Sequence, residues 1–305
     1  MESRSGDAQD GDDTSEEKIL SENIKRRDIQ LPDLPIEDWP QSIPGRCYID
    51  KDEINGYPDL GRSDYDGDEG YHPLVTARNL LEFSTCMRKK DSKAYNQKAR
   101  NITERLLRTA VSRDEAIYFP YTFDFPLHGY EEHTMSSPWF SGMAQGVALS
   151  AFSRLATITG GNLYREVADL VFTSFTNLRG TNQVVDPWTV TTDENRHYWI
   201  EEYPEDPPAH TLNGKIFAIW GLYEYYQLTD LEEAKYICEA AITTVAENIG
   251  RFRVPNEMSY YCLSHDVQDA GYHMTHINQL KKLHELTGIE EFSEYESAFR
   301  SDYSE

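Results

Sequence analysis

The feature that most constrains the fold is a short turn that recurs three times between segments with helical apolar spacing. Its copies are Ile158–Gly161, Leu228–Asp230 and Leu286–Gly288, which begin 70 and 58 residues apart. Each combines Thr with Gly or Asp, and the segment that follows carries acidic side chains near its start, where the helix dipole favours them. The intervals exceed those of common solenoid repeats. The pattern therefore predicts a chain dominated by α-helices, in which stacked hairpins close into an α/α toroid.

A toroid of hairpins would place its functional groups at one end. Its inner helices would line a cavity, and the loops between helices would shape a cleft at the cavity mouth. The alternative is a long irregular helix bundle. Within the second turn, Thr229 and Glu232 have the spacing of a capping box, which predicts that the Thr side chain caps the next helix.

Three regions follow from the distribution of polar, proline and apolar residues. Residues 1–25 form an acidic Ser/Gly/Asp-rich tail, which we expect to be disordered. Residues 26–70 contain five prolines, which indicate an extended arm because proline is excluded from helix interiors. Residues 71–305 would form the toroid, with an aromatic, proline-bounded β-arm at 117–126.

The balance of charges excludes several classes of partner. The chain carries 53 Asp and Glu against 29 Lys and Arg, a formal net charge of −24. A nucleic-acid binder needs clustered cations for the phosphates, and an anionic membrane surface would repel this chain. Only 11 of the basic residues are Lys, which favours a halophilic protein, with an ordinary acidic protein as the alternative.

The apolar runs and the cysteines indicate the compartment. No run approaches the roughly 18 residues of a membrane span, and residues 1–18 lack the cationic and apolar regions of a secretion signal. The cysteines form no CxxC pair and no zinc-binding spacing. They are Cys47, Cys86, Cys238 and Cys262. We expect reduced, mostly buried thiols and no metal, in a soluble cytoplasmic protein.

Three segments concentrate polar and aromatic side chains that no cap or turn requires. The first is Ser137–Gly146, in which Ser137–Pro138 would begin a helix as its N-cap and first residue. Trp139 and Gln145 would then lie near the toroid mouth. Two glycines four residues apart in this segment indicate close helix packing.

The second segment is Trp199–Pro204, in which Glu202 and Tyr203 neither build nor cap a helix. Asn213 lies at the start of the helical pattern that follows. A polar segment without a structural purpose is a candidate site, and a solvated acidic loop is the alternative.

The third segment comprises Tyr260–His265 and Tyr272–Leu280. On a helix, Tyr272, His273 and His276 would share one side. Because so many polar side chains are costly to bury without partners, we expect them to line a wet cavity. A metal site at His273 and His276 is the alternative, although it has no third ligand.

Five motifs in these segments together resemble the C-terminal catalytic domain of the D-glucuronyl C5-epimerases. These enzymes convert D-glucuronic residues of heparan-type chains into L-iduronic residues. The motifs are WFSGMAQGVA from Trp139, EEYPEDPP from Glu201, LNG from Leu212, YCLSH from Tyr261 and YHMTHINQL from Tyr272. They follow one another in the family's order, and the resemblance extends from about residue 75 to residue 299. It implies a helical toroid and chemistry without a cofactor.

The resemblance implies a catalytic group of three tyrosines and one glutamate. These are Tyr203, Tyr261, Tyr272 and Glu202. Epimerisation removes the C5 proton beside a carboxylate and returns a proton from the opposite face, so that an acid/base group is needed on each side. A tyrosine base must ionise below its usual pKa of about 10, and we expect the neighbouring imidazoles to favour that. The residues expected to bind substrate are Trp139, Gln145, Asn213, Arg196, His265, His273 and His276.

Three departures from the family pattern affect the expected substrate. Ser264 stands where the family commonly has Arg, so that Arg196 or Arg179 would have to face the substrate acid groups. His210–Thr211 replaces an aromatic and an aliphatic residue before LNG. We carry over neither the membrane anchor nor the metal-binding β-rich domain of the animal members.

The expected activity is C5 epimerisation of glucuronic residues in a uronic-acid-containing oligo- or polysaccharide, with a homodimer left open. A polysaccharide lyase, which removes the same proton and expels the C4 substituent, is one alternative. A glycoside hydrolase would need two carboxylates across the cleft, such as Glu202 with Glu132 or Asp124. A glycan-binding relative without activity is the third alternative.

Overall fold

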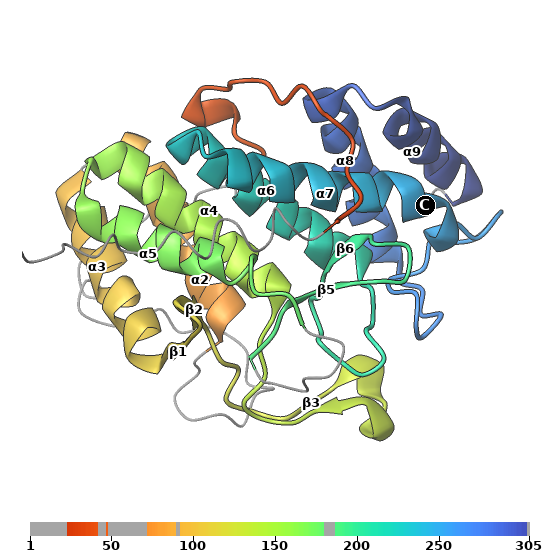
Figure 1. Cartoon of the computed structure of the whole chain (residues 1–305), viewed down its shortest axis with the longest axis horizontal. Coiled ribbons are helices and arrows are strands. Elements are labelled where there is room, and N and C mark those ends of the chain that lie inside the picture. Colours follow the sequence, from red (N-terminus) through yellow and green to blue (C-terminus); the bar gives the residue numbers. More distant parts are fainter. Residues whose placement is uncertain (1–22, 42–46, 48–71, 90–91, 180–186, 304–305) are drawn as a thin grey trace, which may run out of the picture.

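A computed structural model describes residues 23–41, 47, 72–89, 92–179 and 187–303 of the chain. Most of the predicted tail and most of the predicted arm lie outside these residues. The helices form four consecutive hairpins. They are α2 (Pro73–Lys89) with α3 (Ser92–Thr109), α4 (Gly142–Thr159) with α5 (Asn162–Thr173), α6 (Leu212–Thr229) with α7 (Glu232–Asn248), and α8 (Ala270–Thr287) with α9 (Glu290–Asp302). The predicted helical toroid fold is confirmed (Figure 1).

The recurrent turn of the sequence has one conformation in all three copies. Gly160, Asp230 and Gly288 each adopt the left-handed region at a helix C-cap, with φ of 61°, 55° and 67°. The Thr before each of them donates its hydroxyl to the carbonyl four residues earlier and accepts the backbone N–H two residues later. The same local hydrogen bonds therefore end α4, α6 and α8 and reverse the chain into α5, α7 and α9.

The first helix of each hairpin lies on the inside. Helix α4 packs against both α2 and α6, and α6 packs against α8. Gly146 allows the closest of these approaches, because a Cβ at this position would collide with Ala218 of α6. All four inner helices run in the same direction, so that their N-termini gather at one end of the toroid.

Three small antiparallel hairpins lie at that end. They are β1 (Val111–Arg113) with β2 (Ala116–Tyr118), β3 (Phe125–Pro126) with β4 (Thr134–Met135), and β5 (Val190–Thr192) with β6 (Tyr198–Ile200). The 3₁₀ turns η4 (Leu127–Gly129) and η5 (Glu131–His133) connect β3 to β4. The predicted β-arm thus contains β2 and β3, and Figure 1 shows these hairpins on one side of the helices.

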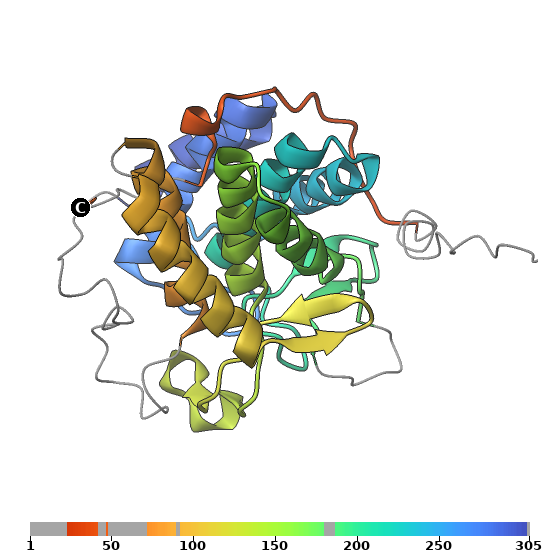
Figure 2. The same cartoon turned by 90° about the vertical axis from the view of Figure 1, so that its left-hand side faces the viewer.

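The N-terminal residues 23–41 run mostly extended across the opposite end, apart from the turn η1 (Ile36–Asp38). Arg154 of α4 donates to Trp39 O, Glu224 of α6 accepts from Gln41 N, and Lys282 of α8 donates to Pro40 O. This segment therefore joins the C-terminal halves of three inner helices. In Figure 2 it crosses the top of the helices, whereas the β3–β4 hairpin lies at the bottom.

Two predicted helix caps are wrong. Helix α4 begins after Ser141, whose hydroxyl accepts from Ala144 N, and Ser137–Pro138 precedes it as a cis peptide in the connecting loop. Thr229 does not cap α7, because its hydroxyl serves the preceding turn and the N-cap residue is Leu231. In the first case Ser141, directly before the helix, supplies the cap, and in the second the Thr229 hydroxyl already serves the turn that ends α6.

The prediction of reduced thiols is wrong for two of the four cysteines. Cys47 and Cys86 form a disulfide, which ties residue 47 to α2, whereas Cys238 and Cys262 are free and buried. Sequence spacing did not reveal the bond, because 39 residues separate its partners. Among the helices that the structure describes, none is both long and apolar enough to cross a membrane.

Candidate active site

A cavity of about 560 Å³ opens at the N-terminal ends of the inner helices. Its wall includes five of the residues expected from the sequence, namely Trp139, Glu202, Tyr203, Asn213 and Tyr272. Residues not expected from the sequence complete it, namely His72, Leu74, Val75, Arg78, Asn79, Tyr121, Phe123, Phe125, Met143, Phe217 and Thr275. The volume lies in the range of small-molecule sites, and the wall mixes aromatic rings with a few polar groups.

Glu202 follows strand β6 and lies over the N-terminus of α6. Gly214 in the first turn of α6 makes this possible, because a Cβ there would collide with the Glu202 carboxylate. Burial raises the pKa of Glu202 to about 7, although hydrogen bonds from Tyr261 and Tyr203 and the charge of Arg78 act in the opposite direction. The carboxyl group is therefore poised to gain or lose a proton near neutral pH.

Tyr261 comes from a loop that is pinned to the start of the same helix. Its carbonyl accepts from Leu212 N at 3.2 Å, and its N–H donates to Val267 O at 2.7 Å. The hydroxyl of Tyr261 lies 3.2 Å from Glu202 Oε2 and 3.4 Å from the Tyr203 hydroxyl. Two phenols and one carboxyl group thus form a buried network.

Tyr272 stands at the start of α8, where the Asp269 carboxylate caps the helix by accepting its N–H at 3.0 Å. Its ring meets the Tyr261 ring at 4.5 Å between centroids. Its side chain is exposed, in contrast to those of Tyr203 and Tyr261. The three phenols expected from the sequence are therefore adjacent.

The expected ionisation of the tyrosines does not agree with their surroundings. Burial, and next the charge of Glu202, raise the pKa of Tyr203 and of Tyr261 well above its usual value. Both hydroxyls therefore keep their protons at neutral pH and act as donors. In this network the group with a pKa near neutrality is Glu202.

One wall of the cavity is a stack of aromatic rings. Trp139 stacks on Tyr121 at 3.8 Å and on Phe125 at 5.9 Å, and Phe125 stacks on Tyr203 at 5.8 Å. The indole N–H of Trp139 donates to Phe123 O, which holds the ring in place. A flat aromatic wall of this kind suits the C–H face of a sugar ring.

The positive charge of the cavity comes from an unexpected residue. Arg78 of α2 lines the cavity, and it lies over the Phe217 ring at 5.9 Å. The sequence candidates lie elsewhere, because Arg196 forms the tip of the β5–β6 hairpin and Arg179 pairs with Asp206 at 3.2 Å. Arg78 lies in the second turn of α2, a helix in which the sequence analysis identified no site residue.

Three other expected residues have structural partners outside the cavity. Gln145 is buried and bridges Phe119 N, Ile117 O and Ser174 Oγ, which fixes β2 to α4. His273 lies between Ser259 and the Phe299 carbonyl, and His276 contacts Ser259 Oγ at 2.8 Å. The helix face carrying the two imidazoles turns into the protein and away from the phenols. Burial, and next the charge of His273, lower the pKa of His276 to about 3.

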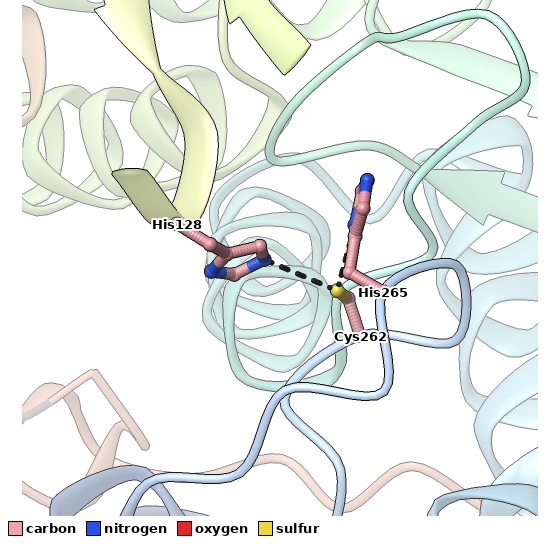
Figure 3. Close-up of side chains that lie close together, drawn as sticks. All are labelled: His128, Cys262 and His265. Carbon is pink, nitrogen blue, oxygen red and sulfur yellow. Dashed lines mark hydrogen bonds between the residues drawn. The ribbon is translucent and has the colours of Figure 1, made fainter. Parts of the chain in front are cut away.

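His265 lies next to the cavity in a second polar cluster. Its Nδ1 is 3.2 Å from Cys262 Sγ, and His128 Nε2 approaches the same sulfur at 3.3 Å (Figure 3). Its Nε2 faces His133 and Glu205, each at 3.3 Å. Burial, and next the charges of the other imidazoles, lower the pKa of His128 to about 4.

Behind Glu202, a chain of buried polar groups holds the segment that carries it. Glu201 pairs with His210 at 2.6 Å, and His210 stacks on Trp199 at 4.0 Å. The Lys215 Nζ lies 4.3 Å from the centre of the Trp199 ring. It also donates a hydrogen bond to Tyr198 O at 2.6 Å. His210, one of the departures noted in the sequence, therefore contacts Glu201 and does not line the cavity.

The fold defines the architectural class of this protein, an α/α toroid. The structure of the cellobiose 2-epimerase from Bacillus thermoamylovorans matches it with a TM-score of 0.53 and 9% identity, covering 75% of this chain. The chain spans 59% of that protein, and the likeness establishes the fold alone. The chain belongs to the family described as D-glucuronyl C5-epimerase C-terminus, which matches residues 113–301. An uncharacterized protein from Methanocaldococcus jannaschii is 22% identical over 222 residues, which are 69% of this chain and 68% of the relative.

Proposed function

We propose that this protein is a uronyl C5-epimerase that converts D-glucuronic into L-iduronic residues within a glycan. The observation that carries the proposal is the pair Glu202 and Tyr203 at the wall of a cavity with room for a sugar ring, both hydrogen-bonded to the buried Tyr261. It combines a carboxyl group of pKa about 7 with protonated phenols, as general acid–base chemistry near neutral pH requires. Membership of the family supports the same reaction.

In the proposed reaction, the Glu202 carboxylate takes the C5 proton. The electrons of the C5–H bond delocalise into the neighbouring substrate carboxylate, which forms an enediolate. Tyr272, which lines the cavity, then donates its proton to C5 from the opposite face. Tyr272 is exposed and takes a proton back from solvent, while Glu202 releases the captured proton, so that the site returns to its initial protonation state.

The substrate carboxylate must be neutralised for this step to be feasible. Arg78 supplies a full charge in the cavity, and the N-termini of α2, α4, α6 and α8 add partial positive charge from their dipoles. Asn213 adds a polar side chain to the wall, and its buried Oδ1 has no hydrogen-bond partner among the described residues. We propose that this oxygen accepts a substrate hydroxyl.

The alternatives make different demands on the same cavity. A retaining or inverting glycosidase needs two carboxyl groups, whereas Glu202 supplies the one carboxyl group of the described cavity wall. A lyase would use the same proton abstraction but would release an unsaturated uronide. A binding protein would hold the glycan without chemistry.

Deuterium exchange separates these outcomes. The purified protein is incubated in D₂O, at high and low salt, with polysaccharides that alternate glucuronic acid with hexosamine, and C5 deuterium is measured by NMR. An epimerase incorporates deuterium at C5 and produces iduronic residues. Unsaturated products would identify a lyase, and binding without any exchange would overturn the proposal.

The matched controls are two conservative variants. Glu202→Gln keeps the shape of the carboxyl group but cannot take a proton, and it should lower the exchange rate by about 10²–10⁴-fold. Tyr164→Phe removes a phenol outside the cavity, whose hydroxyl contacts Asn96 at 3.4 Å, and it should leave the rate unchanged.

A further inference from the structure

Beside the cavity, two imidazoles converge on one buried sulfur. His128 reaches Cys262 from η4, after strand β3, whereas His265 follows Cys262 in the same loop (Figure 3). The three candidate ligand atoms, His128 Nε2, Cys262 Sγ and His265 Nδ1, all lie within 4.8 Å of one another. We propose that these three residues bind a zinc-like transition-metal ion, independently of the proposed epimerase reaction.

The distances fit tetrahedral coordination with little movement. Zinc lies about 2.3 Å from a thiolate and about 2.0–2.1 Å from an imidazole nitrogen, which places sulfur and nitrogen about 3.6 Å apart at the tetrahedral angle. The two N···S separations are 3.3 and 3.2 Å. An opening of a few tenths of an ångström therefore admits the ion. One sulfur with two imidazole nitrogens favours zinc over the hard cations calcium and magnesium, which prefer oxygen.

The second nitrogen of His265 has the partners that metal-bound histidines usually have. Its Nε2 lies 3.3 Å from Glu205 Oε2 and 3.3 Å from His133 Nδ1. A proton on Nε2, the nitrogen beside this carboxylate, leaves the lone pair of Nδ1 directed at Cys262. A carboxylate behind a ligating imidazole fixes its tautomer and orientation.

The ion would join two pieces of the cavity wall. His128 follows Phe125, which stacks on Tyr203, and Cys262 follows Tyr261, which meets the His128 ring at 5.3 Å. A bound ion therefore fixes the β3–β4 hairpin to the loop that carries Tyr261. His133, Glu205 and His265 form the rival set of ligands, which contains no sulfur.

Cobalt(II) distinguishes the two sets, because thiolate ligation produces a near-ultraviolet charge-transfer absorption. Chelator-treated full-length protein is titrated with Co²⁺ and then with Zn²⁺. We expect one equivalent of cobalt with thiolate absorption and the visible bands of tetrahedral geometry, both of which zinc abolishes. Cobalt binding without thiolate absorption, or no binding, overturns the proposal.

Variants locate the ion. Cys262→Ser should abolish the thiolate absorption, whereas Cys238→Ser, at the other free buried thiol, should retain it. Glu205→Gln should weaken cobalt binding by about 10–100-fold, and His128→Gln should weaken it more. If Cys262→Ser does not fold, the metal site is tested instead by comparing hydrogen exchange of the wild type and of His128→Gln, each with and without zinc. Zinc should slow exchange of residues 125–135 in the wild type and not in His128→Gln, and equal protection in both would contradict the proposal.

Discussion

The Tyr261 hydroxyl lies 3.2 Å from the Glu202 carboxylate, although 59 residues separate them along the chain. This contact depends on a loop pinned to the start of α6 and on a glycine in the first turn of that helix. It connects the group that titrates near neutrality with a phenol that stays protonated.

The pH dependence of exchange should report Glu202. A base acts when it is ionised, so that kcat/KM should rise with pH up to about 7 and level off above it. Exchange rates at constant ionic strength between pH 5 and 9 test this. A rate that falls between pH 5 and 7 would contradict the assignment of Glu202 as the base.

The same carboxyl group should lower stability as it ionises. Its pKa is about 7 in the folded protein against 4.5 as the ordinary value, so its contribution is fully present below pH 4.5 and is lost as the pH rises through 7. At about 1.4 kcal/mol per pKa unit, the loss is about 3 kcal/mol. Glu202→Gln should lack this loss, so urea unfolding of both proteins at pH 4.5 and 8 should show the variant relatively more stable at pH 8. An equal pH dependence in both proteins would show that Glu202 titrates normally.

Tyr261→Phe should change the titration of Glu202 as well as the rate. The hydroxyl of Tyr261 stabilises the carboxylate, and without it the pKa of Glu202 should rise further. We expect the rate to fall by about 10²–10⁴-fold and the inflection of its pH profile to move upward. In Tyr164→Phe neither quantity should change. If Tyr261→Phe lowers the rate but leaves the inflection of the pH profile unchanged, the Tyr261 hydroxyl does not influence the pKa of Glu202.

Gly214→Ala should damage the site while the fold remains. The added methyl group would collide with the Glu202 carboxylate and displace it. Misplacement of a catalytic group by about 1 Å can lower the rate by about 10²-fold. Gly161→Ala, directly before α5 and away from the cavity, is the matched control, because its methyl group would meet only Thr159 Oγ1, at 3.3 Å. Circular dichroism checks folding, and full activity of Gly214→Ala would contradict the described position of Glu202.

Arg154→Met should destabilise the end of the toroid opposite the cavity. Arg154 forms two hydrogen bonds with buried Glu224, at 2.8 and 2.7 Å, and losing them leaves a buried charge unpaired. The expected cost is about 3–5 kcal/mol in urea unfolding. The double variant Arg154→Met/Glu224→Gln should recover part of it.

The control for this pair is Arg165→Met. Arg165 forms a partly exposed ion pair with Asp169 on α5 at 2.8 Å, and its loss should cost at most about 1 kcal/mol. If Arg154→Met and Arg165→Met lower the free energy of unfolding equally, the buried pair stabilises the protein no more than the partly exposed pair.

Much of the fold could be predicted because it depends on local signals. The Thr–Gly and Thr–Asp turns recur in sequence, and the same hydrogen bonds between the Thr hydroxyl and the backbone produce them in every copy. The error at Ser137 arose because Ser141, four residues later, can make the same cap, and the error at Thr229 arose because its hydroxyl already serves the preceding turn. The disulfide of Cys47 and Cys86 could not be predicted, because it depends on how a distant segment packs on α2.

The site was predictable to the extent that family motifs supply its residues. Glu202, Tyr203, Tyr261 and Tyr272 meet as expected, while their catalytic roles stay a prediction. Helical spacing placed Tyr272 and the two imidazoles on one side, but it could not say which of them face the cavity. Arg78 and His128 gave no signal, since their importance depends on long-range packing of α2 and of the segment after β3.

Because the inner helices run parallel, the cavity and the contacts that hold the helices to the N-terminal segment lie at opposite ends of the protein. The residues around the cavity belong to loops and helix starts, whereas the N-terminal segment secures the helix ends on the far side through Arg154, Glu224 and Lys282. Loops at the cavity can therefore lengthen or change their side chains without loosening the clamp that holds the helices together. A lineage of such proteins can acquire new sugar preferences at one pole while the other pole preserves its architecture.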